Sequence, residues 1–348
     1  MRTFDYSFLR TGRVPGRVVD AVAGIGAARE RNALRFSRFA PVFAKLEGIA
    51  RVQSVKASNA IEGIVTSDRR IREIVDRFSG PLNHDEDEIA GYRDALDLIH
   101  RHHDTLDCRS TDILRLHELL LSHTPAPAGI YKDVDNAIIE IDASGHRRLR
   151  FPTVSAADTP DAMEQIILAY QAARGSQGVN QLLLIPCFVL DFLCVHPFAD
   201  GNGRMSRLLT LLLLYKAGHS IGRYISLEEQ THRRKEDYYD ALRESSLRWH
   251  EGANDYFPFV LFFLDVVTAC YRELDKRFAT TGDGRVTKRG RVEATVLGSL
   301  IPLRKADILE ILPDVSATTI EAILGDLVRQ GRVRKIGSGR ATAYVRGG

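Results

Sequence analysis

Cysteine is scarce in this sequence. The chain has four cysteines in 348 residues, at positions 108, 187, 194 and 270, and no two of them form a C-x-x-C pair. Most of them also have apolar neighbours along the chain. This pattern is unlike a disulfide framework, so we expect reduced, buried cysteines in a cytoplasmic protein.

The sequence also has no uninterrupted apolar run long enough to cross a bilayer. Its longest apolar stretch is broken by Pro186 and Asp191, whereas a transmembrane helix needs about 20 consecutive apolar residues. The first residues, MRTFDYSFLRTGR, contain no apolar core of a signal peptide. Internal repeats and low-complexity tracts are absent as well. We therefore expect no role in a membrane.

The net charge is small, at +3, but it is unevenly distributed. Residues 285–348 contain 12 Lys and Arg against 6 Asp and Glu, a net charge of +6, so residues 1–284 carry −3. Such an asymmetry is typical of a basic appendage attached to a nearly neutral body.

Most of the sequence has a helical pattern. Apolar residues recur at helical spacing through residues 15–80 and 86–123, and again after residue 159. A Gly-rich polar segment, TTGDGR at residues 280–285, is the strongest candidate for a domain boundary. We therefore predict a mainly α-helical protein with three units, which are an N-terminal helical region (1–85), a central helical domain (86–280) and a C-terminal domain (285–348).

Two short stretches differ from this helical pattern. Residues 136–151 have the composition of two strands around a Gly-containing turn, which predicts a small β-hairpin. After residue 285, three helical segments are followed by a Gly-tipped hairpin, RVRKIGSGRATAYVR. This order of elements predicts a winged helix-turn-helix domain.

Polar, anion-binding groups are concentrated in HPFADGNGRMSR, residues 196–207, which lies between two strongly apolar stretches. Residues 201–203 stand where a loop enters a helix, and the free amides of a helix N-terminus form an anion site. Arg204 and Arg207 are three positions apart, so we expect their guanidinium groups to reach the same ligand. Two arginines beside such an amide nest favour a polyphosphate over a single carboxylate.

Two further side chains of this stretch suit catalysis. Asp200 is a hard oxygen ligand of the kind that binds Mg²⁺ bridging phosphates. His196 is the one group in the stretch that can accept a proton near neutral pH. Burying two arginines, an aspartate and a histidine without a ligand would be costly, so a purely structural loop is the weaker interpretation.

The stretch resembles the signature of the Fic family, H-x-F-x-D/E-G-N-G-R-x-x-R, at every fixed position. Members of that family typically transfer AMP from ATP to a Ser, Thr or Tyr hydroxyl of a protein. The resemblance, which covers roughly residues 50–265, therefore implies a Fic-type helical bundle with protein adenylyltransferase activity, ATP as co-substrate and Mg²⁺ as cofactor. The predicted hairpin would be the family's flap, which registers the target segment by strand addition.

The resemblance also implies a role for each residue of the motif. His196 would be the general base, Phe198 would anchor the loop in the core, and Asp200 would bind the metal. The ATP phosphates would be bound by Gly201, Asn202 and Gly203 as the anion hole, by Arg204 at the β-phosphate and by Arg207 at the γ-phosphate.

A second motif, SNAIEG at residues 58–63, resembles the inhibitory motif of the family, S/T-x-x-x-E-G/N. Its fixed positions are Ser58, Glu62 and Gly63, and the first two share one helix face. By the resemblance, Glu62 pairs with Arg207 in the place of the γ-phosphate, so that ATP cannot bind in line for attack. The motif lies N-terminal to the Fic signature, as in the class whose inhibition is intramolecular. Taken alone, it also fits a solvated helix end.

YYDAL, residues 238–242, resembles the stretch that lines the adenine and ribose in relatives. Tyr238, Tyr239 and Leu242 would then form the base pocket, although tyrosines at this spacing are equally typical of a core. Some relatives carry a ribose-binding asparagine seven residues after the second tyrosine. Ser246 stands there in this sequence, which leaves the ribose contact open, and UTP or GTP as the donor is left open too.

Two other functions stay open at the level of the sequence. The C-terminal domain favours a DNA-binding regulator whose Fic body senses a nucleotide, because phosphate neutralisation supplies most nonspecific DNA affinity. The basic residues of its predicted wing are Arg332, Arg334, Lys335, Arg340 and Arg346. A protein-docking or dimerising module is an equal interpretation, and no feature fixes a homodimer. The same pocket would also serve removal of AMP, with Glu62 orienting a water. The sequence does not identify the target protein, which would be another chain or the protein itself. It also does not identify the signal that relieves inhibition.

Overall fold

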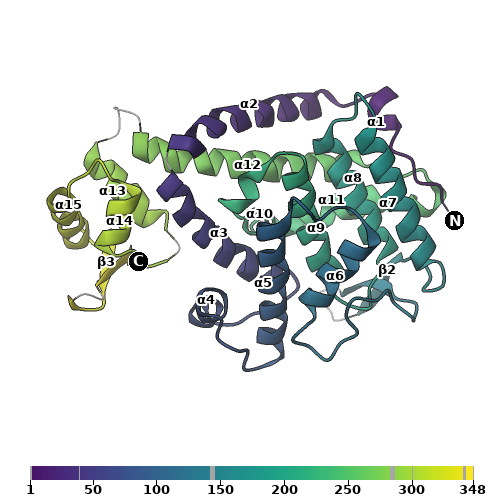
Figure 1. Cartoon of the computed structure of the whole chain (residues 1–348), viewed down its shortest axis with the longest axis horizontal. Helices are drawn as coiled ribbons and strands as arrows, with labels where there is room; N and C mark the ends of the chain where they lie inside the picture. The colour runs from purple at the N-terminus through teal and green to yellow at the C-terminus, as the bar shows by residue number, and fades with distance from the viewer. Residues whose placement is uncertain are drawn as a thin grey trace.

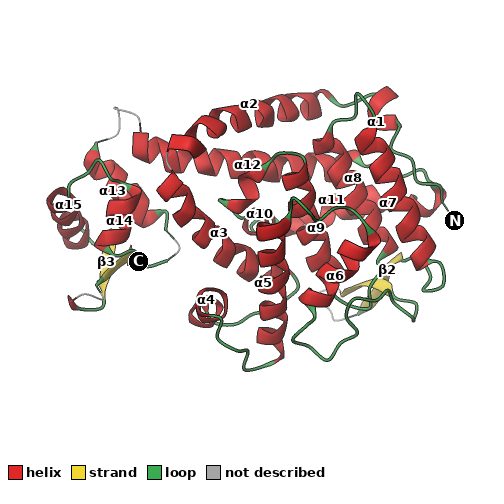
Figure 2. Cartoon of the chain, viewed as in Figure 1, coloured by secondary structure: helices red, strands yellow, loops and turns green. Residues whose placement is uncertain are grey.

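The computed structural model describes residues 2–38, 40–141, 146–282, 287–299, 301–339 and 342–347. These residues are mainly helical, as the sequence predicts, and their strands form two separate antiparallel pairs. Figure 1 shows most helices packed into one body, with a smaller unit at the C-terminal end of the chain. Figure 2 shows how small a part of the described chain is strand.

The N-terminal helices contain the motif SNAIEG and lead to the central helices. They are α1 (Phe8–Thr11), α2 (Gly16–Arg38), α3 (Ala40–Ile61), α4 (Asp68–Arg77) and α5 (His84–His102). Helix α3 ends at the residue before Glu62, so the motif SNAIEG spans the end of this helix.

The central elements surround the stretch 196–207. They are α6 (Ser110–Leu120), β1 (Ala137–Ile141), β2 (Arg147–Pro152), α7 (Thr159–Gly175), α8 (Gln181–Val195), α9 (Asn202–Lys216), the 3-10 helix η1 (Ser220–Arg223), α10 (Leu227–His232), α11 (Lys235–Ser246), the 3-10 helix η2 (Trp249–Glu251) and α12 (Phe257–Gly282).

Buried apolar side chains of the described residues form two separate clusters. The larger cluster joins α2 and α3 to the central helices, so that Val18, Val55 and Leu212 belong to one core. The smaller cluster lies within residues 292–333 of the C-terminal unit. The predicted division of the chain at residues 85 and 280 stays a prediction.

Helices α8 and α9 lie at the centre of the larger core because they are apolar on almost every side. All of residues 182–195 are buried. The side chain of Asn180 caps the start of α8 by accepting a hydrogen bond from the Leu182 amide at 2.9 Å. The end of α8 and the first turn of α9 are therefore enclosed, and this places the polar stretch between them inside the protein body.

Strands β1 and β2 form the predicted hairpin, which we call the flap hairpin. Ala137 pairs with Pro152, and a bulge after Ile138 shifts the register before Ile139 pairs with Leu149. Ile139 is 48% exposed and Leu149 is 58% exposed, so the hairpin presents an apolar outer face. Residues 142–145, which contain most of the predicted turn, lie outside the described residues.

Helix α12 extends into the segment predicted as a domain boundary, residues 280–285, because it continues to Gly282. The boundary itself stays a prediction. Glycine and threonine are weak helix breakers, because each costs at most about 1 kcal/mol in a helix that is already formed and gains one hydrogen bond per added residue. Residues 283–286 lie outside the described residues.

The C-terminal unit contains the predicted elements in the predicted order. They are α13 (Lys288–Leu297), α14 (Lys305–Ile311), α15 (Ala317–Arg329), β3 (Val333–Ile336) and β4 (Ala343–Arg346), and the two strands pair antiparallel. Its assignment as a winged helix stays a prediction. Nζ of Lys45 in α3 lies 2.9 Å from Oδ1 of Asp307 in α14. The unit therefore contacts α3, the helix in which the motif SNAIEG begins.

The basic residues of the predicted wing differ in their surroundings. Arg332 forms an ion pair with Glu293 of α13, which neutralises its charge within the unit. Arg332 is nevertheless exposed, as are Arg334, Lys335 and Arg346. Arg340 lies outside the described residues.

All four cysteines are buried and unpaired, which confirms their predicted place in the core. Among the described residues, the structure contains no helix that is both long enough and apolar enough to cross a membrane.

Candidate active site

His196 lies directly after the last residue of α8. It adopts a left-handed conformation, with φ 53° and ψ 61°, and its amide donates to the Phe192 carbonyl at 2.9 Å. Residues other than glycine rarely adopt this conformation. Its Nδ1 lies 3.2 Å from the carbonyl oxygen of Leu193. Since a carbonyl can only accept, Nδ1 carries the proton, and Nε2 is left as an acceptor.

Burial lowers the pKa of His196 to about 4. The Leu193 carbonyl and the carboxylates of Glu62 and Asp200 act in the opposite direction, and the ammonium group of Lys132 adds to the lowering. The imidazole is therefore uncharged at neutral pH, and its Nε2 lone pair is able to accept a proton.

The turn after His196 is the predicted entry from a loop into a helix. Helix α9 begins at Asn202 with Gly201 as its N-cap, and the φ of 79° at Gly201 belongs to a region that favours glycine. A Cβ atom on Gly203 would lie 2.2 Å from Oε1 of Glu62, so the close approach of these two residues also requires glycine. No side chain caps this helix start, and its first amides are oriented to bind an anion.

Side chains beneath the loop hold it in place. The Asn202 side chain accepts from the Phe198 amide at 2.9 Å and donates to the Phe198 carbonyl at 2.8 Å. The buried Phe198 ring stacks on the His117 imidazole with centroids 3.7 Å apart. Nδ1 of His117 accepts from the Gly129 amide, so its Nε2 donates to the Asp200 carbonyl at 3.1 Å. The loop conformation is thus fixed on both sides.

The motif SNAIEG meets the Fic-like motif at Arg207. Nε of Arg207 donates to the Ser58 hydroxyl at 2.8 Å, and Nη2 donates to the Ser58 carbonyl at 2.9 Å and to Oε1 of Glu62 at 2.8 Å. Gly63, at φ 85°, turns the chain away directly after this contact. The remaining nitrogen of Arg207, Nη1, is buried and makes no hydrogen bond within the described part of the chain.

The charge of Arg207 is maintained despite its burial. Burial alone would lower the pKa of this guanidinium, but the Glu62 carboxylate and the hydroxyls of Tyr238 and Tyr92 raise it above its ordinary value. A buried cation needs such a partner, and in this structure the partner is Glu62.

The two arginines of the motif bind different carboxylates in this structure, and the prediction that they reach one ligand stays a prediction. Arg204 forms an ion pair with Glu88 of α5 and a second one, at 3.2 Å, with Asp200. Its side chain is 2% exposed. Residues three positions apart share a helix face, but their Cβ atoms are about 5–6 Å apart, so each guanidinium pairs with the carboxylate nearest to it.

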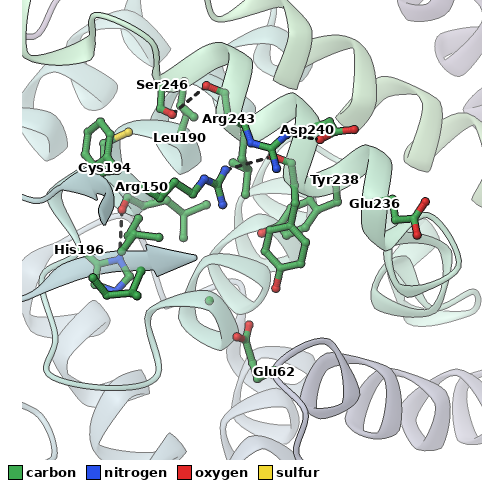
Figure 3. Close-up of a pocket in the computed structure, with 17 residues that line it drawn as sticks. Glu62, Arg150, Leu190, Cys194, His196, Glu236, Tyr238, Asp240, Arg243 and Ser246 are labelled. Carbon is green, nitrogen blue, oxygen red and sulfur yellow. Dashed lines mark hydrogen bonds and ion pairs between the residues drawn. The ribbon is translucent and has the colours of Figure 1, made fainter. Parts of the chain in front are cut away.

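A cavity of about 640 Å³ opens beside these groups. His196, Gly203 and Glu62 line one end of it. Arg150 extends from β2 across the cavity and donates to the Tyr239 carbonyl at 3.1 Å, as Figure 3 shows. The residues of α11 that line the wall include all those predicted for the base pocket, namely Tyr238, Tyr239 and Leu242, together with Ser246. The volume suits a ligand the size of a nucleotide.

A second cavity, of about 340 Å³, lies on the other side of Glu62. It is lined by the turn at the start of α9, residues 201–204, and by the carboxylates of Asp200 and Glu88. Glu62, His196 and Gly203 line both cavities. Glu62 therefore borders both the predicted base pocket and the predicted phosphate site.

Asp200 is the one predicted metal ligand, and its side chain is 60% exposed. The described residues contain no group of three or more metal-binding side chains. A Mg²⁺ ion bound here would take most of its oxygen ligands from a phosphate chain and water, which is the usual mode of Mg²⁺ in nucleotide sites. The residues present fit that mode.

Sequence reasoning missed three charged residues that the fold brings to this site. Glu88 pairs with Arg204, Arg150 crosses the cavity, and Lys132 lowers the pKa of His196. Glu88 belongs to the acidic run HDEDE, which is typical of a solvated helix start. No local pattern distinguishes any of the three from ordinary surface residues.

Known proteins resemble this chain in both sequence and fold. Residues 106–214 match the model of the Fic/DOC family. A "Protein adenylyltransferase Fic" from Nematostella vectensis is 27% identical over 244 residues, which cover 67% of this chain and 50% of that protein. Another from Aedes aegypti is 45% identical over 71 residues, 20% of this chain and 12% of that protein. The chain thus spans half or less of the length of these relatives.

Solved structures resemble most or nearly all of the chain in fold. A Fic family protein from Desulfovibrio desulfuricans G20 has a TM-score of 0.63 at 21% identity, over 97% of this chain and 97% of that one. Fic-1 from C. elegans has a TM-score of 0.56 at 20% identity, over 76% of this chain and 73% of that one. The chain thus contains a segment that matches the Fic/DOC family model, within a mainly helical fold similar to that of Fic proteins.

Proposed function

We propose that this Fic/DOC-domain protein is a protein adenylyltransferase that transfers AMP from ATP to a hydroxyl of a target protein and is autoinhibited by Glu62. One observation carries the proposal. A cavity of about 640 Å³ is lined by His196, Gly203 and side chains of α11, and it shares Glu62, His196 and Gly203 with the second cavity, which is lined by residues 199–204. The relatives named protein adenylyltransferase support it.

The geometry supports one orientation of ATP. The base would lie among Tyr238, Tyr239 and Leu242, and the phosphates would pass His196 toward the N-terminus of α9. There the first amides of α9 and the guanidinium groups of Arg204 and Arg207 would neutralise the phosphate charge. The buried Nη1 of Arg207, which makes no hydrogen bond within the described part of the chain, is a donor ready for such an oxygen.

The reaction needs one proton acceptor, and His196 supplies it. The target hydroxyl oxygen forms a bond to the α-phosphorus, and the bond from that phosphorus to the oxygen bridging to the β-phosphate breaks. The hydroxyl proton passes to Nε2 of His196, and pyrophosphate leaves. The negative charge of the bound triphosphate raises the low pKa of this imidazole toward neutrality, which makes it a better base.

Glu62 would inhibit the reaction by occupying the place of the γ-phosphate. Its carboxylate already pairs with Nη2 of Arg207 and lies against Gly203. A γ-phosphate brought to the same guanidinium would meet a like charge, so ATP would bind weakly or out of line. Ser58 contributes by holding the Arg207 side chain in this orientation.

Asp200 would hold the Mg²⁺ ion, which neutralises phosphate charge when bound. The partially apolar outer face of the flap hairpin, with Ile139 and Leu149, suits contact with an extended segment of the target.

The test is transfer of label by the full chain with Mg²⁺ and a cell lysate. We expect wild type to transfer little label from α-labelled ATP, and Glu62→Gly to label a lysate protein or itself strongly. Label from γ-labelled ATP should stay at background. Equal label from both nucleotides, or none from Glu62→Gly, would contradict the proposal.

Removal of AMP is a second candidate function, and the position of Glu62 favours it. This carboxylate lies between both cavities beside His196, and its side chain is 33% exposed, so a water beside it has access to the site. A glutamate so placed is able to orient a water for hydrolysis. Release of AMP from a modified target by wild type, but not by Glu62→Gly, would favour this function over transfer.

A further inference from the structure

Lys132 is a buried charged residue that the proposed reaction does not use. It lies between α6 and β1, is 4% exposed, and its Nζ donates to three oxygens. These are Oδ1 of Asn136 at 2.7 Å, Oγ1 of Thr153 at 3.1 Å and the carbonyl oxygen of Val195 at 3.3 Å. An ammonium group has three donors, so each proton has one acceptor.

The contacts of Lys132 enclose His196 on both sides along the chain. Its Nζ donates to the carbonyl of Val195, the residue before His196. Its backbone amide donates at 2.9 Å to the carbonyl of Pro197, the residue after His196. Since His196 has a left-handed conformation that few residues adopt, these two bonds help to hold the backbone that aims its imidazole.

The other two contacts of Lys132 reach both ends of the flap hairpin. Asn136 directly precedes β1, and Thr153 directly follows β2. The Thr153 hydroxyl lies 2.7 Å from the Asn136 carbonyl oxygen and side-chain oxygen, and the Asn136 amide donates to the Phe198 carbonyl at 2.9 Å. One ammonium group therefore joins the base of the flap hairpin to the two residues that flank His196.

The physical chemistry of Lys132 suits a hydrogen-bonded link between neighbouring elements, which we call the tie, more than an ion pair with a charged partner. Its acceptors are neutral oxygens, and burial lowers its pKa to about 8, although Asp135 acts in the opposite direction. It is still mostly charged at pH 7. Hydrogen bonds from a buried ion are short and directional, so they hold neighbouring elements at fixed distances better than apolar packing does.

We propose that Lys132 is a positioning residue that sets the distance and orientation of the flap hairpin relative to His196. The inference deepens the proposed function and rests on it, because the flap hairpin would carry the target hydroxyl to this imidazole. Lys132 lines neither cavity at the site, so it would act on transfer without contacting ATP.

The experiment introduces Lys132→Met into the full chain with Glu62→Gly. Methionine keeps the length and apolar stem of the side chain and removes its donors. The matched control is Lys216→Met, which removes an ammonium group bonded at 3.0 Å to the Asp104 carbonyl at the far end of α9. Thr153→Val removes one acceptor of the tie, and Thr153→Ser retains it, so this pair keeps the test valid if Lys132→Met folds poorly.

We expect Lys132→Met to lower the rate of AMP transfer roughly ten- to hundredfold, because a displacement of about 1 Å has such an effect. The Kd for ATP should change less than about twofold. Thr153→Val should show a smaller loss of the same kind, and Thr153→Ser should restore most of the rate. An unchanged transfer rate, or a Kd for ATP that weakens in proportion to the rate, would overturn the inference.

Amide hydrogen exchange separates this inference from the proposed function, since it needs no activity. We expect exchange in residues 137–141 and 147–152 to be roughly tenfold faster in Lys132→Met than in Lys216→Met. If exchange is faster in Lys132→Met but Glu62→Gly alone transfers no AMP, the tie is supported and the proposed function is wrong. Unchanged exchange in these strands would overturn the tie whatever the activity.

Discussion

Nη2 of Arg207 and Oε1 of Glu62 lie 2.8 Å apart, although 145 positions separate the two residues in the chain. The contact joins the end of α3 to the first turns of α9. A guanidinium that binds a carboxylate in this way presents the same donors that a phosphate oxygen would use. The proposed function therefore implies that ATP and Glu62 compete for one cation.

Replacement of Glu62 by glycine should strengthen ATP binding. A hydrogen bond to a charged group contributes about 1.5–3 kcal/mol, so we expect the Kd for ATP to fall roughly ten- to hundredfold. Isothermal titration calorimetry with MgATP on wild type and Glu62→Gly measures this change. Glu47→Gln, on the same helix, is the control and should leave the Kd unchanged. Equal affinity of wild type and Glu62→Gly would exclude the competition.

Replacement of His196 by alanine should abolish transfer while it leaves nucleotide binding intact. A general base contributes about 10²–10⁴-fold to a rate, so we expect a loss of that size when His196→Ala is combined with Glu62→Gly. Transfer of labelled AMP and calorimetry, performed on the same preparation, separate the two effects. Persistent transfer by the double variant would remove His196 from its role as the base.

Filling the larger cavity should weaken ATP binding specifically. Leu242→Trp adds volume to a wall of the cavity, and overpacking costs about 1–3 kcal/mol, so we expect the Kd for ATP of the Glu62→Gly protein to rise roughly tenfold. Leu247→Trp is the matched control, because Leu247 is 62% exposed and does not line this cavity. Both variants should keep their Tm within a few degrees. Equal Kd values for the two would place the base elsewhere.

The protein should lose stability in mild acid. Burial lowers the pKa of His117, His196 and His219 to about 4 each, whereas an unfolded chain has a histidine pKa of about 6.5. The unfolded state therefore binds more protons between these values. The stability is fully present above about pH 6.5 and falls as the pH drops toward 4, by roughly 2 kcal/mol per histidine at pH 5.

Thermal unfolding at pH 7.5 and pH 5.0 measures this loss. We expect a clearly lower Tm at pH 5.0 and a smaller decrease in His219→Gln, which keeps a neutral group beside the Tyr271 hydroxyl. The exposed residue His102 provides the control, and His102→Gln should behave like wild type. A Tm that is equal or higher at pH 5.0 would contradict the assignment of these imidazoles as buried and neutral.

Local features of the site could be predicted because short-range rules determine them. The turn at Gly201 and Gly203 enters a helix where the motif requires it, since only glycine suits the positive φ of the first and the close approach of the second. The pairing of Glu62 with Arg207 was expected from the resemblance alone. The sequence itself contains no signal that joins residues 145 positions apart.

Other features could not be predicted because they depend on packing between distant elements. Glu88 meets Arg204 only because α5 packs beside α9, and Lys132 finds its acceptors only after α8 and the flap hairpin come together. The extension of α12 to Gly282, inside the predicted boundary segment, also has no local signal. Threonine and glycine are weak helix breakers, so residues 280–282 continue the long helix that precedes them.

Identification of the group that Glu62→Gly transfers from ATP tests the central claim most directly. The measurement is peptide mass spectrometry of lysate proteins, and of the variant itself, after reaction with MgATP. The account predicts AMP esterified to a Ser, Thr or Tyr hydroxyl, absent when His196→Ala is added. A phosphoryl group in its place, or no adduct on any protein although the variant binds ATP, would contradict the account.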